Sequence, residues 1–503
     1  MWILDMLKKK ADSPDAAVIS REQSLTYSQL WSQSETAARY ILERCRTRNP
    51  VLIYGNKELE ITVLMIACLK TGRAYVPLDI TYPRERVRHI CQDVEAELVF
   101  NCSEVSLEMD NEVQIIEREE IRKILQRPCQ KEVPSEKYVK EEDNCYILFT
   151  SGSTGKAKGV QINRRNIENF VGWFSNECLE DNENDIVMNQ VSYSFDVSVI
   201  PLYIFLGAGK CLFSIDKEML DHTKLLFEYL RKSGINVWVS TPTFLEMCCF
   251  DDSFNEDLLP GLRKIILAGE ILTKQLVSQL NEKFPKAQVI NGYGPTEGTV
   301  LLSSCVITSD MMKDEKMLPI GKVLPDGEYK IVDDEGNVVK EGETGELIIS
   351  SKSISKGYFK NPEQTQKVFF EVDGKQWYRT GDLIFEEAGL LYYVSRKDTQ
   401  IKLNGYRIEL NDISENLNAL EMISNSVVLP SWKDGRVSFL TAFVTLLSRD
   451  EGKSDLKVGI EIKKRLRLRV PSYMVPKKIV ILDHFPMNIN GKIDRKKLEE
   501  EYL

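Results

Sequence analysis

The stretch Tyr146-Ile-Leu-Phe-Thr-Ser-Gly-Ser-Thr-Gly-Lys-Ala-Lys-Gly-Val160 decides the fold of this chain. Four residues typical of a β-strand, Tyr146–Phe149, lead into a segment dominated by Ser, Thr, Gly and Lys. Glycines let the backbone turn its N–H groups toward one point, and the hydroxyls and lysines add donors and positive charge there. The composition predicts a loop that holds a polyphosphate, with a flexible surface turn as the alternative.

The spacing of this loop excludes the commonest phosphate-binding motif. A Walker A sequence has four residues between its first Gly and its Gly-Lys pair, and Ser or Thr follows. Here only Ser153 and Thr154 separate Gly152 from Gly155, and Ala157 follows Lys156. The sequence therefore predicts a nucleotide site outside the P-loop kinase and ATPase folds.

Length and composition limit the class of protein. A chain of 503 residues is too long for one core and predicts at least two domains. Its content of 43% hydrophobic and 28% charged residues is typical of soluble globular proteins, and no apolar run reaches the ~18 residues of a membrane span. The eleven cysteines form no C-x-x-C pair, and there are only three histidines. We therefore predict reduced thiols in a cytoplasmic protein that does not insert into a membrane and has no zinc site.

The charge of the chain is unevenly distributed. A net charge of −10 argues against nucleic acid as a partner. Residues 453–503 nevertheless hold 13 Lys and Arg against 7 Asp and Glu, with a basic run at Lys463–Arg469. This run is either a solvated helix face or a docking surface for an acidic partner.

The pattern of hydrophobic residues predicts an α/β fold. Short β-rich runs alternate with helix-like stretches such as Thr223–Leu230, which is typical of α/β lobes with largely parallel sheets. From about 328 to 395 the pattern changes to short strands between turns, which predicts a small antiparallel or barrel-like β-subdomain. A lysine-rich α+β segment follows, so we place a domain boundary between residues 396 and 397. The runs expected to form parallel strands are Val51–Tyr54, Ala96–Phe100, Val237–Ser240, Lys264–Leu267 and Gln288–Asn291.

Four further segments combine turn residues with side chains that a plain turn does not need. Asn291–Glu297 follows a strand and places two glycines, a proline, Tyr293 and a carboxylate in a turn. Tyr378–Leu383 places Asp382 on a tight turn, which suits the two vicinal hydroxyls of a ribose. The charged segment Ser395–Glu409 lies on the predicted domain boundary, and Asn488–Arg495 contains the pair Gly491-Lys492.

Together and in this order, these segments resemble the adenylate-forming enzymes, specifically the amino-acid adenylation domains of peptide synthetases. The resemblance runs from Ser24 to Arg495. It implies a large N-terminal domain of two α/β lobes plus a β-subdomain at residues 1–396, and a small mobile C-terminal domain at 397–503. Within the family the chain is most similar to the free-standing ligases that load D-alanine onto a carrier protein, through Ser192–Ser198 and Asn236–Phe244. That likeness implies an acidic phosphopantetheinylated carrier supplied in trans.

The resemblance assigns roles to individual residues. An amino-acid carboxylate would attack the α-phosphate of ATP, and the acyl group would then pass to a thiol, so that catalysis consists of positioning and charge stabilisation. Glu297 would bind Mg²⁺. Tyr293 would stack on adenine, Asn291 would meet the adenine amino group, and Asp382 would bind the ribose. The expected ATP-binding residues are Thr150, Ser151, Ser153, Thr154, Lys158, Asn291, Gly292, Tyr293, Gly294, Pro295, Thr296, Asp382, Tyr393, Arg396 and Lys492.

Three residues carry the sharpest expectations. Lys492 would be catalytic, because a positive charge between the substrate carboxylate and the α-phosphate offsets repulsion between two anions; the alternative is a solvated turn lysine. Asp196 would pair with the substrate ammonium, and its alternative is a helix N-cap. Asp398 would be the hinge about which the small domain rotates.

The substrate pocket departs from the pattern of the D-alanine ligases. Those enzymes carry a cysteine against the substrate Cα where this chain has Ala268, and larger side chains are expected at Gly292 and Gly298, whereas Val300 matches. These changes predict a roomier substrate pocket that discriminates less strongly between amino acids. D-alanine is favoured, with L-alanine, glycine or serine as alternatives. An acyl- or aryl-CoA ligase is disfavoured by Asp196, and a catalytically silent module is disfavoured because Lys492, Glu297 and Asp382 are all present.

Overall fold

The computed structural model describes residues 2–109, 113–129, 131–152, 157–180, 184–314, 316–433, 436–448, 454–487 and 493–503. The chain divides into two compact units. The first comprises residues 1–80, 91–149 and 159–397, and the second comprises 81–90, 150–158 and 398–503.

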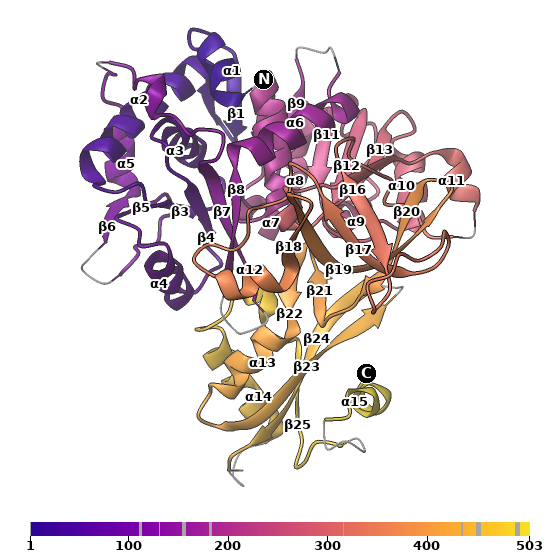
Figure 1. The fold of residues 1–503 in the computed structure, drawn as a ribbon. Helices are drawn as coiled ribbons and strands as arrows, with labels where there is room; N and C mark the ends of the chain where they lie inside the picture. Colours follow the sequence, from indigo (N-terminus) through magenta and orange to yellow (C-terminus); the bar gives the residue numbers. More distant parts are fainter. Residues whose placement is uncertain are drawn as a thin grey trace. The chain divides into compact units, whose positions relative to one another are not determined.

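The larger sheet of the first unit has nine strands (Figure 1). Its inner pairings, from β13 through β12, β11, β9 and β10 to β1, are parallel, whereas β2, β14 and β15 pair antiparallel at the edges. In spatial order the strands are β15 (Lys322–Val323), β14 (Ser303–Val306), β13 (Gln288–Tyr293), β12 (Lys264–Ala268), β11 (Val237–Ser240), β9 (Ile186–Asn189), β10 (Cys211–Ser214), β1 (Ala16–Ser20) and β2 (Gln23–Thr26).

A second sheet of the first unit has six strands, and the pairings between β6, β5, β3, β4 and β7 are all parallel. In spatial order the strands are β6 (Gln114–Glu117), β5 (Leu98–Asn101), β3 (Val51–Gly55), β4 (Tyr75–Asp79), β7 (Asn144–Thr150) and β8 (Lys158–Asn163). β7 and β8 lie on either side of the glycine-rich loop predicted to hold a polyphosphate.

A third sheet of five strands is entirely antiparallel. Its strands are β16 (Glu328–Val332), β17 (Gly345–Ser350), β18 (Phe369–Val372), β19 (Lys375–Glu387) and β20 (Leu390–Arg396). It is the β-subdomain that the sequence predicted from about residue 328.

Several helices begin at residues whose side chains cap the first turn. Thr26 and Gln29 form a capping box at the start of α2, and Asn163 and Asn166 form one at the start of α6. The first-unit helices are α1 (Ile3–Lys9), α2 (Tyr27–Arg44), α3 (Leu59–Lys70), α5 (Arg118–Leu125), α6 (Arg164–Cys178), α7 (Lys217–Asp221), α8 (Thr223–Ser233), α9 (Pro242–Cys249), α10 (Lys274–Lys283), α11 (Ser309–Lys313) and α12 (Pro362–Val368). Short single turns add η1 (Ser135–Lys137), η2 (Asp196–Ser198), the π-helix η3 (Ile200–Phe205), η4 (Leu206–Ala208) and η5 (Thr296–Gly298).

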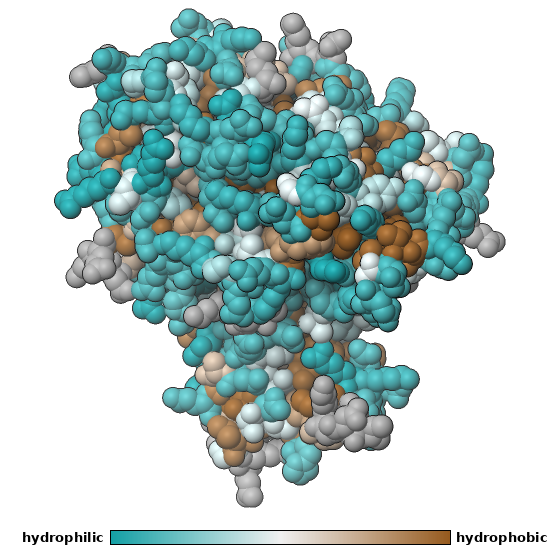
Figure 2. Space-filling model, in the orientation of Figure 1, coloured by the Kyte–Doolittle hydropathy of each residue, from teal (hydrophilic) through white to brown (hydrophobic). Residues whose placement is uncertain are grey.

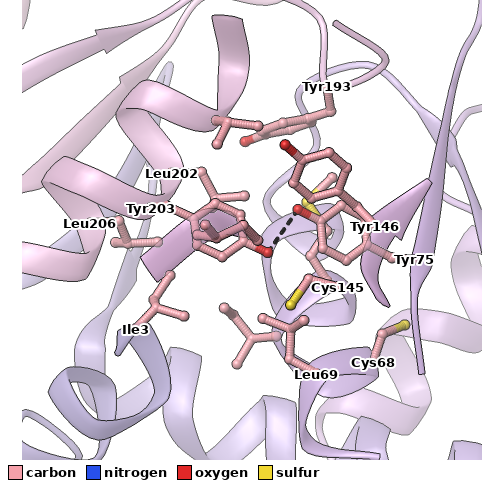
Figure 3. Packing of buried hydrophobic residues seen from close by; sticks show 14 of the residues in the cluster. Ile3, Cys68, Leu69, Tyr75, Cys145, Tyr146, Tyr193, Leu202, Tyr203 and Leu206 are labelled. Atoms are coloured by element: carbon pink, nitrogen blue, oxygen red, sulfur yellow. Dashed lines mark hydrogen bonds between the residues drawn. The ribbon is translucent and has the colours of Figure 1, made fainter. Parts of the chain in front are cut away.

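A group of tyrosines lies in the main hydrophobic core of the first unit (Figure 3). The hydroxyls of Tyr75 and Tyr203 are 3.0 Å apart, and the ring of Tyr146 lies 5.8 Å from that of Tyr75 and 6.4 Å from that of Tyr203. Tyr75 is on β4, Tyr146 on β7 and Tyr203 on η3. The core therefore joins the six-stranded sheet to the segment that follows Asp196.

The second unit is a smaller α+β structure. Its antiparallel hairpin of β21 and β22 precedes a three-stranded sheet in which β24 pairs antiparallel with β23 and parallel with β25. Buried residues of α13, β24 and α14, including Ile413, Leu440 and Ile462, form its core. Its elements are α4 (Arg84–Asp93, in this unit up to Ile90), β21 (Gln400–Leu403), β22 (Tyr406–Glu409), α13 (Leu410–Asn418), β23 (Ile423–Lys433), β24 (Arg436–Leu446), α14 (Asp455–Leu466), η6 (Ser472–Met474), β25 (Lys478–Ile481) and α15 (Arg495–Tyr502).

The predicted α/β class, with a large N-terminal part and a smaller C-terminal one, is confirmed. Predicted strand runs fall on β3, β5, β11, β12 and β13, and the predicted helix at Thr223 is α8. Hydrophilic side chains cover most of the face shown in Figure 2. Within the described ranges, no helix is long and apolar enough to cross a membrane.

Candidate active site

The ends of β12 and β13 gather several of the predicted residues. Ala268 is the last residue of β12 and pairs with Gly292 on β13. β13 extends to Tyr293, so the turn predicted at Asn291–Glu297 begins only at Gly294. The prediction was wrong here because β13 is an interior strand, and its pairing with β12 and β14 on both sides keeps these residues extended.

The turn after β13 requires a glycine. A Cβ atom on Gly294 would lie 2.5 Å from the Val300 carbonyl oxygen and 2.7 Å from the Leu301 Cα atom, so only glycine fits. Pro295 precedes the single turn η5, which begins at Thr296. The strand residue Asn291 is buried and donates a hydrogen bond from Nδ2 to the Pro319 carbonyl at 2.9 Å, which orients its carboxamide.

The backbone just beyond η5 is strained. Thr299 and Val300 have φ angles of 56° and 75°, and β-branched residues rarely adopt this left-handed region. The Thr299 hydroxyl donates to the Ser353 carbonyl at 2.6 Å, and Val300 is buried. Such conformations persist where the surroundings fix them, and they cluster at functional sites.

Tyr293, Asp382 and Arg396 form a buried polar group. The Tyr293 hydroxyl donates to Asp382 Oδ2 at 2.5 Å, and Arg396 Nη1 pairs with Asp382 Oδ1 at 2.7 Å. Burial, and next the charge of Asp382, raise the pKa of Tyr293 well above its ordinary value, so the hydroxyl remains a donor. The half-buried Tyr393 places its ring 6.5 Å from that of Tyr293. Two aromatic rings and a fixed carboxylate thus lie together, as a nucleoside site requires.

Asp382 does not lie on a tight turn. The predicted turn Tyr378–Leu383 is the middle of β19, a strand of 13 residues. Gly381 has a φ angle of 71°, and the register of β19 with β17 shifts at this point. An irregularity within the strand therefore gives the sequence Thr380-Gly-Asp its turn-like composition.

Asp196 and Thr296 meet although they are 100 residues apart in sequence. The Thr296 hydroxyl donates to Asp196 Oδ2 at 2.7 Å. Asp196 is the first residue of η2, whose N-cap position is Phe195, and no side chain caps this turn. The helix-cap alternative is therefore not what the structure contains, and the half-buried carboxylate is oriented by the segment that follows β13.

Glu297 is fully buried and accepts a hydrogen bond on Oε1 from the Tyr358 hydroxyl at 2.8 Å. Mg²⁺ prefers oxygen ligands and is commonly held by one or two carboxylates together with substrate phosphates. The Glu297 side chain, which is oriented by a neutral hydroxyl, fits that requirement. No cluster of three His, Cys, Asp or Glu suited to a metal occurs within the described residues. An ion at Glu297 would also take ligands from the nucleotide phosphates and from water.

The pocket is not roomier at Gly292 and Gly298, and that prediction was wrong. A Cβ atom on Gly292 would lie 2.8 Å from Cδ2 of Leu301, and one on Gly298 would lie 2.7 Å from Cγ of Leu302. Both leucines are buried. The space released by each glycine is therefore filled by a leucine side chain. Of the three changes, only Ala268 is still expected to remove a contact with the substrate.

Thr150 and Ser151, at the start of the glycine-rich loop, form hydrogen bonds to other residues of the second unit. The Thr150 hydroxyl donates to the Lys158 carbonyl at 3.5 Å. Ser151 Oγ donates to the Arg407 carbonyl at 2.9 Å and accepts from the Glu409 amide at 3.1 Å. Asp398 Oδ1 accepts from the Gln400 amide at 3.1 Å, next to the start of β21. Ser153, Thr154 and Lys492 lie outside the described residues.

Three of these contacts were not predicted from the sequence. Tyr358 binds Glu297, Thr296 orients Asp196 although it was expected to bind ATP, and Leu301 fills the space beside Gly292. Tyr358 lies 61 residues from its partner, so spacing gave no signal. Leu301 follows Val300 directly, and two bulky residues after two glycines could have indicated compensation in volume.

Comparison with protein families agrees with this geometry. A family model for AMP-binding enzymes matches residues 7–359, and one for the C-terminal domain of AMP-binding enzymes matches residues 412–492. The chain therefore belongs to the AMP-binding enzyme family, and as a member it is an adenylate-forming enzyme that uses ATP.

Individual relatives narrow the class further. The chain is 39% identical over 505 residues to the D-alanine–D-alanyl carrier protein ligase of Bacillus licheniformis, a match that spans 100% of this chain and 99% of the relative. It is 38% identical to the ligase of the same name from Bacillus velezensis, with 100% of both chains covered. An adenylation domain from Vibrio cholerae, solved in complex with glycyl-adenosine-5'-phosphate, has a TM-score of 0.84 at 22% identity and covers 99% of this chain and 96% of that one, which shows the fold.

Proposed function

We propose that this protein activates a small amino acid, D-alanine first, with ATP and loads it onto a separate carrier protein. A carboxylate oxygen of the amino acid attacks the α-phosphorus of ATP, the bond from that phosphorus to the bridging oxygen of the β-phosphate breaks, and pyrophosphate leaves. The carrier's phosphopantetheine sulfur then attacks the acyl carbon, AMP leaves with both electrons of the broken acyl–oxygen bond, and the thiol proton passes to solvent.

The observation that carries this proposal is the fixed Asp196 carboxylate. Thr296 orients it from the segment that also carries Tyr293 and Glu297. A carboxylate beside an uncharged acyl chain would be desolvated without a partner, whereas a substrate ammonium would form a charge-assisted pair. Asp196 therefore favours an amino acid over the acyl-CoA substrates of other adenylate-forming enzymes.

The other residues have assigned roles in the nucleotide site. Tyr293 and Tyr393 would face adenine with Asn291, while Asp382 and Arg396 would bind the ribose. Glu297 would hold Mg²⁺, which would offset the charge of the phosphates when bound. The β- and γ-phosphates would be held by residues between the end of β7 and the start of β8, namely Thr150, Ser151, Ser153, Thr154 and Lys158.

Lys492 would stabilise the attack on the α-phosphate. One preorganised donor of this kind contributes about 3–4 kcal/mol to transition-state stabilisation. We assign residues 1–396 to the adenylation core and 397–503 to a mobile domain that carries Lys492 and turns about Asp398. The excess of Lys and Arg in residues 453–503 supports an acidic carrier protein as partner, and the use of ATP fits a cytoplasmic site of action.

D-alanine is supported by the names of relatives that match the whole chain at 37–39% identity. Ala268 keeps L-alanine, glycine and serine as competitors. The decisive experiment is ATP–pyrophosphate exchange with a panel of D- and L-amino acids in the presence of Mg²⁺. We expect D-alanine to give the highest kcat/KM. Exchange with none of the small amino acids would refute amino-acid activation.

A further inference from the structure

Lys57 is a buried lysine that the proposed reaction does not use. It lies between the end of β3 at Gly55 and the start of α3 at Leu59, and its side chain is only 2% exposed. Lys70, at the other end of α3, pairs with Glu35 at 2.7 Å, whereas the carboxylate whose charge acts on Lys57 is that of Asp79 on β4. Burial lowers the pKa of Lys57 well below its ordinary value. An amine in such surroundings depends on a few specific polar contacts.

These contacts lie at the end of β9 and in the segment that follows it. Lys57 Nζ donates to Asn189 Oδ1 at 2.7 Å and lies 3.7 Å from the centroid of the Tyr193 ring. Asn189 Nδ2 in turn donates to the Tyr193 hydroxyl at 2.8 Å, and the hydroxyl of Thr62 lies 3.3 Å from the same oxygen. Lys57 thus contacts the face of the Tyr193 ring, and Asn189 and Thr62 contact its hydroxyl.

Tyr193 lies three residues before Asp196, within a compact turn. The Phe195 amide donates to the Ser192 carbonyl at 2.9 Å, and the Ser192 hydroxyl donates to Asp79 at the end of β4. Tyr193 also belongs to the core cluster that contains Tyr146 and Tyr203 (Figure 3). A shift of the Tyr193 ring therefore moves the backbone that presents Asp196.

We propose that Lys57 is a positioning residue for the amino-acid pocket, because it fixes Asn189 and Tyr193 and through them the Asp196 carboxylate. This inference rests on the proposed function, in which Asp196 binds the substrate ammonium. Lys57 contacts Asn189 and the Tyr193 ring and acts through them. Since Tyr293 and Arg396 are each held by Asp382, loss of Lys57 weakens amino-acid binding selectively.

The test compares two buried lysines at opposite ends of one helix. Lys57→Met keeps the length and apolar stem but removes the donor and the charge. We expect KM for D-alanine to rise about tenfold or more in ATP–pyrophosphate exchange, while KM for ATP stays within about twofold of wild type. Lys70→Met, the matched control, breaks a buried ion pair and should lower Tm without changing the KM for D-alanine.

Two further variants separate positioning from general destabilisation. Tyr193→Phe keeps the ring under Lys57 but removes the hydroxyl held by Asn189 and Thr62, so it should raise the same KM even if Lys57→Met does not fold. In an Asp196→Ala background, Lys57→Met should have little additional effect, because the group it positions is absent.

The outcomes distinguish this inference from the function on which it rests. Wild-type protein that exchanges with no small amino acid refutes the proposed function and the inference with it. Wild-type exchange combined with an unchanged KM in Lys57→Met and Tyr193→Phe, or with equal losses for ATP and the amino acid, overturns the inference alone.

Discussion

The hydroxyl of Tyr293 donates a hydrogen bond to Oδ2 of Asp382 at 2.5 Å. Tyr293 ends β13 of the nine-stranded sheet, and Asp382 lies in β19 of the five-stranded sheet. This bond joins the two sheets at the candidate nucleotide site. It holds the tyrosine ring in one orientation and leaves Oδ1 of Asp382 to Arg396. The Tyr293 ring, which is expected to bind adenine, and the Asp382 carboxylate, which is expected to bind the ribose, therefore hold each other in position.

Removing the hydroxyl should weaken nucleotide binding. Tyr293→Phe keeps the ring but leaves Asp382 without one donor, and a hydrogen bond to a charged group is typically worth about 1.5–3 kcal/mol. We expect KM for ATP to rise about tenfold or more in pyrophosphate exchange, with KM for the amino acid nearly unchanged. Tyr392→Phe is the control, because the Tyr392 ring stacks on Phe385 and its hydroxyl bonds to none of the described residues. An unchanged KM for ATP in Tyr293→Phe would contradict the assignment.

Asp196→Ala should act on the other substrate. The substrate ammonium loses its charge-assisted partner, so KM for the amino acid should rise about a hundredfold while ATP binding is retained. Titration of each substrate in the exchange assay gives both values. Thr296→Val, which removes only the hydroxyl that orients Asp196, should show the same selectivity with a smaller effect. Equal losses for both substrates would mean that Asp196 is structural.

Leu301→Ala should widen the pocket. Because the Leu301 side chain occupies the space next to Gly292, its truncation should raise kcat/KM for D-2-aminobutyrate relative to D-alanine by about 10-fold. Competition between the two amino acids in one reaction measures this ratio directly. Leu302→Ala, which opens space beside Gly298 instead, is the matched comparison. A ratio that stays at the wild-type value would place the size limit elsewhere.

Ala268→Cys tests whether this position selects between the D- and L-enantiomers of alanine. Ala268 is buried at the end of β12. The resemblance to the D-alanine ligases implies a cysteine at this position, against the substrate Cα. Restoring that contact should raise the ratio of D-alanine to L-alanine in kcat/KM, because a methyl-sized contact contributes about 1–3 kcal/mol to discrimination. Ala268→Ser tests whether volume or sulfur matters. If neither variant changes the ratio, chirality is set by other residues of the pocket.

The stability of the second unit should depend on pH through Asp412. Burial raises the pKa of this carboxyl from 3.8 to about 6. The folded state therefore holds more protons than the unfolded state between these values, so stability falls as pH rises through that window and stays reduced above it. Asp412→Asn mimics the protonated form and removes this loss, which amounts to about 1.4 kcal/mol per pKa unit.

Calorimetric unfolding of the full chain at about pH 4.5 and 7.5 checks this prediction. We expect the gain in Tm of Asp412→Asn over wild type to be larger at the higher pH. Glu421→Gln, at an exposed position of the same unit, serves as the control and should follow the wild type. An equal gain at both pH values would show that packing, and not charge, causes the difference.

Local pattern was enough for much of this protein. The alternation of β-rich and helical runs predicted the α/β class, and the change after residue 328 predicted the antiparallel sheet, because side-chain periodicity directly reflects which face is buried. The residues to which we assign the chemistry could also be picked out in the sequence, since few functions other than ligand binding place Tyr293 and Glu297 beside glycines and a proline.

Tertiary structure decided what those residues contact. Thr296 reaches Asp196 across 100 residues, Tyr293 reaches Asp382 across 89, and Lys57 reaches Asn189 across 132, and no sequence period encodes such separations. The volume of the pocket was likewise decided by packing, because Leu301 and Leu302 fill the space that Gly292 and Gly298 vacate. The sequence shows which side chain is absent at a position. Only the folded structure shows which neighbouring side chain fills the space that it leaves.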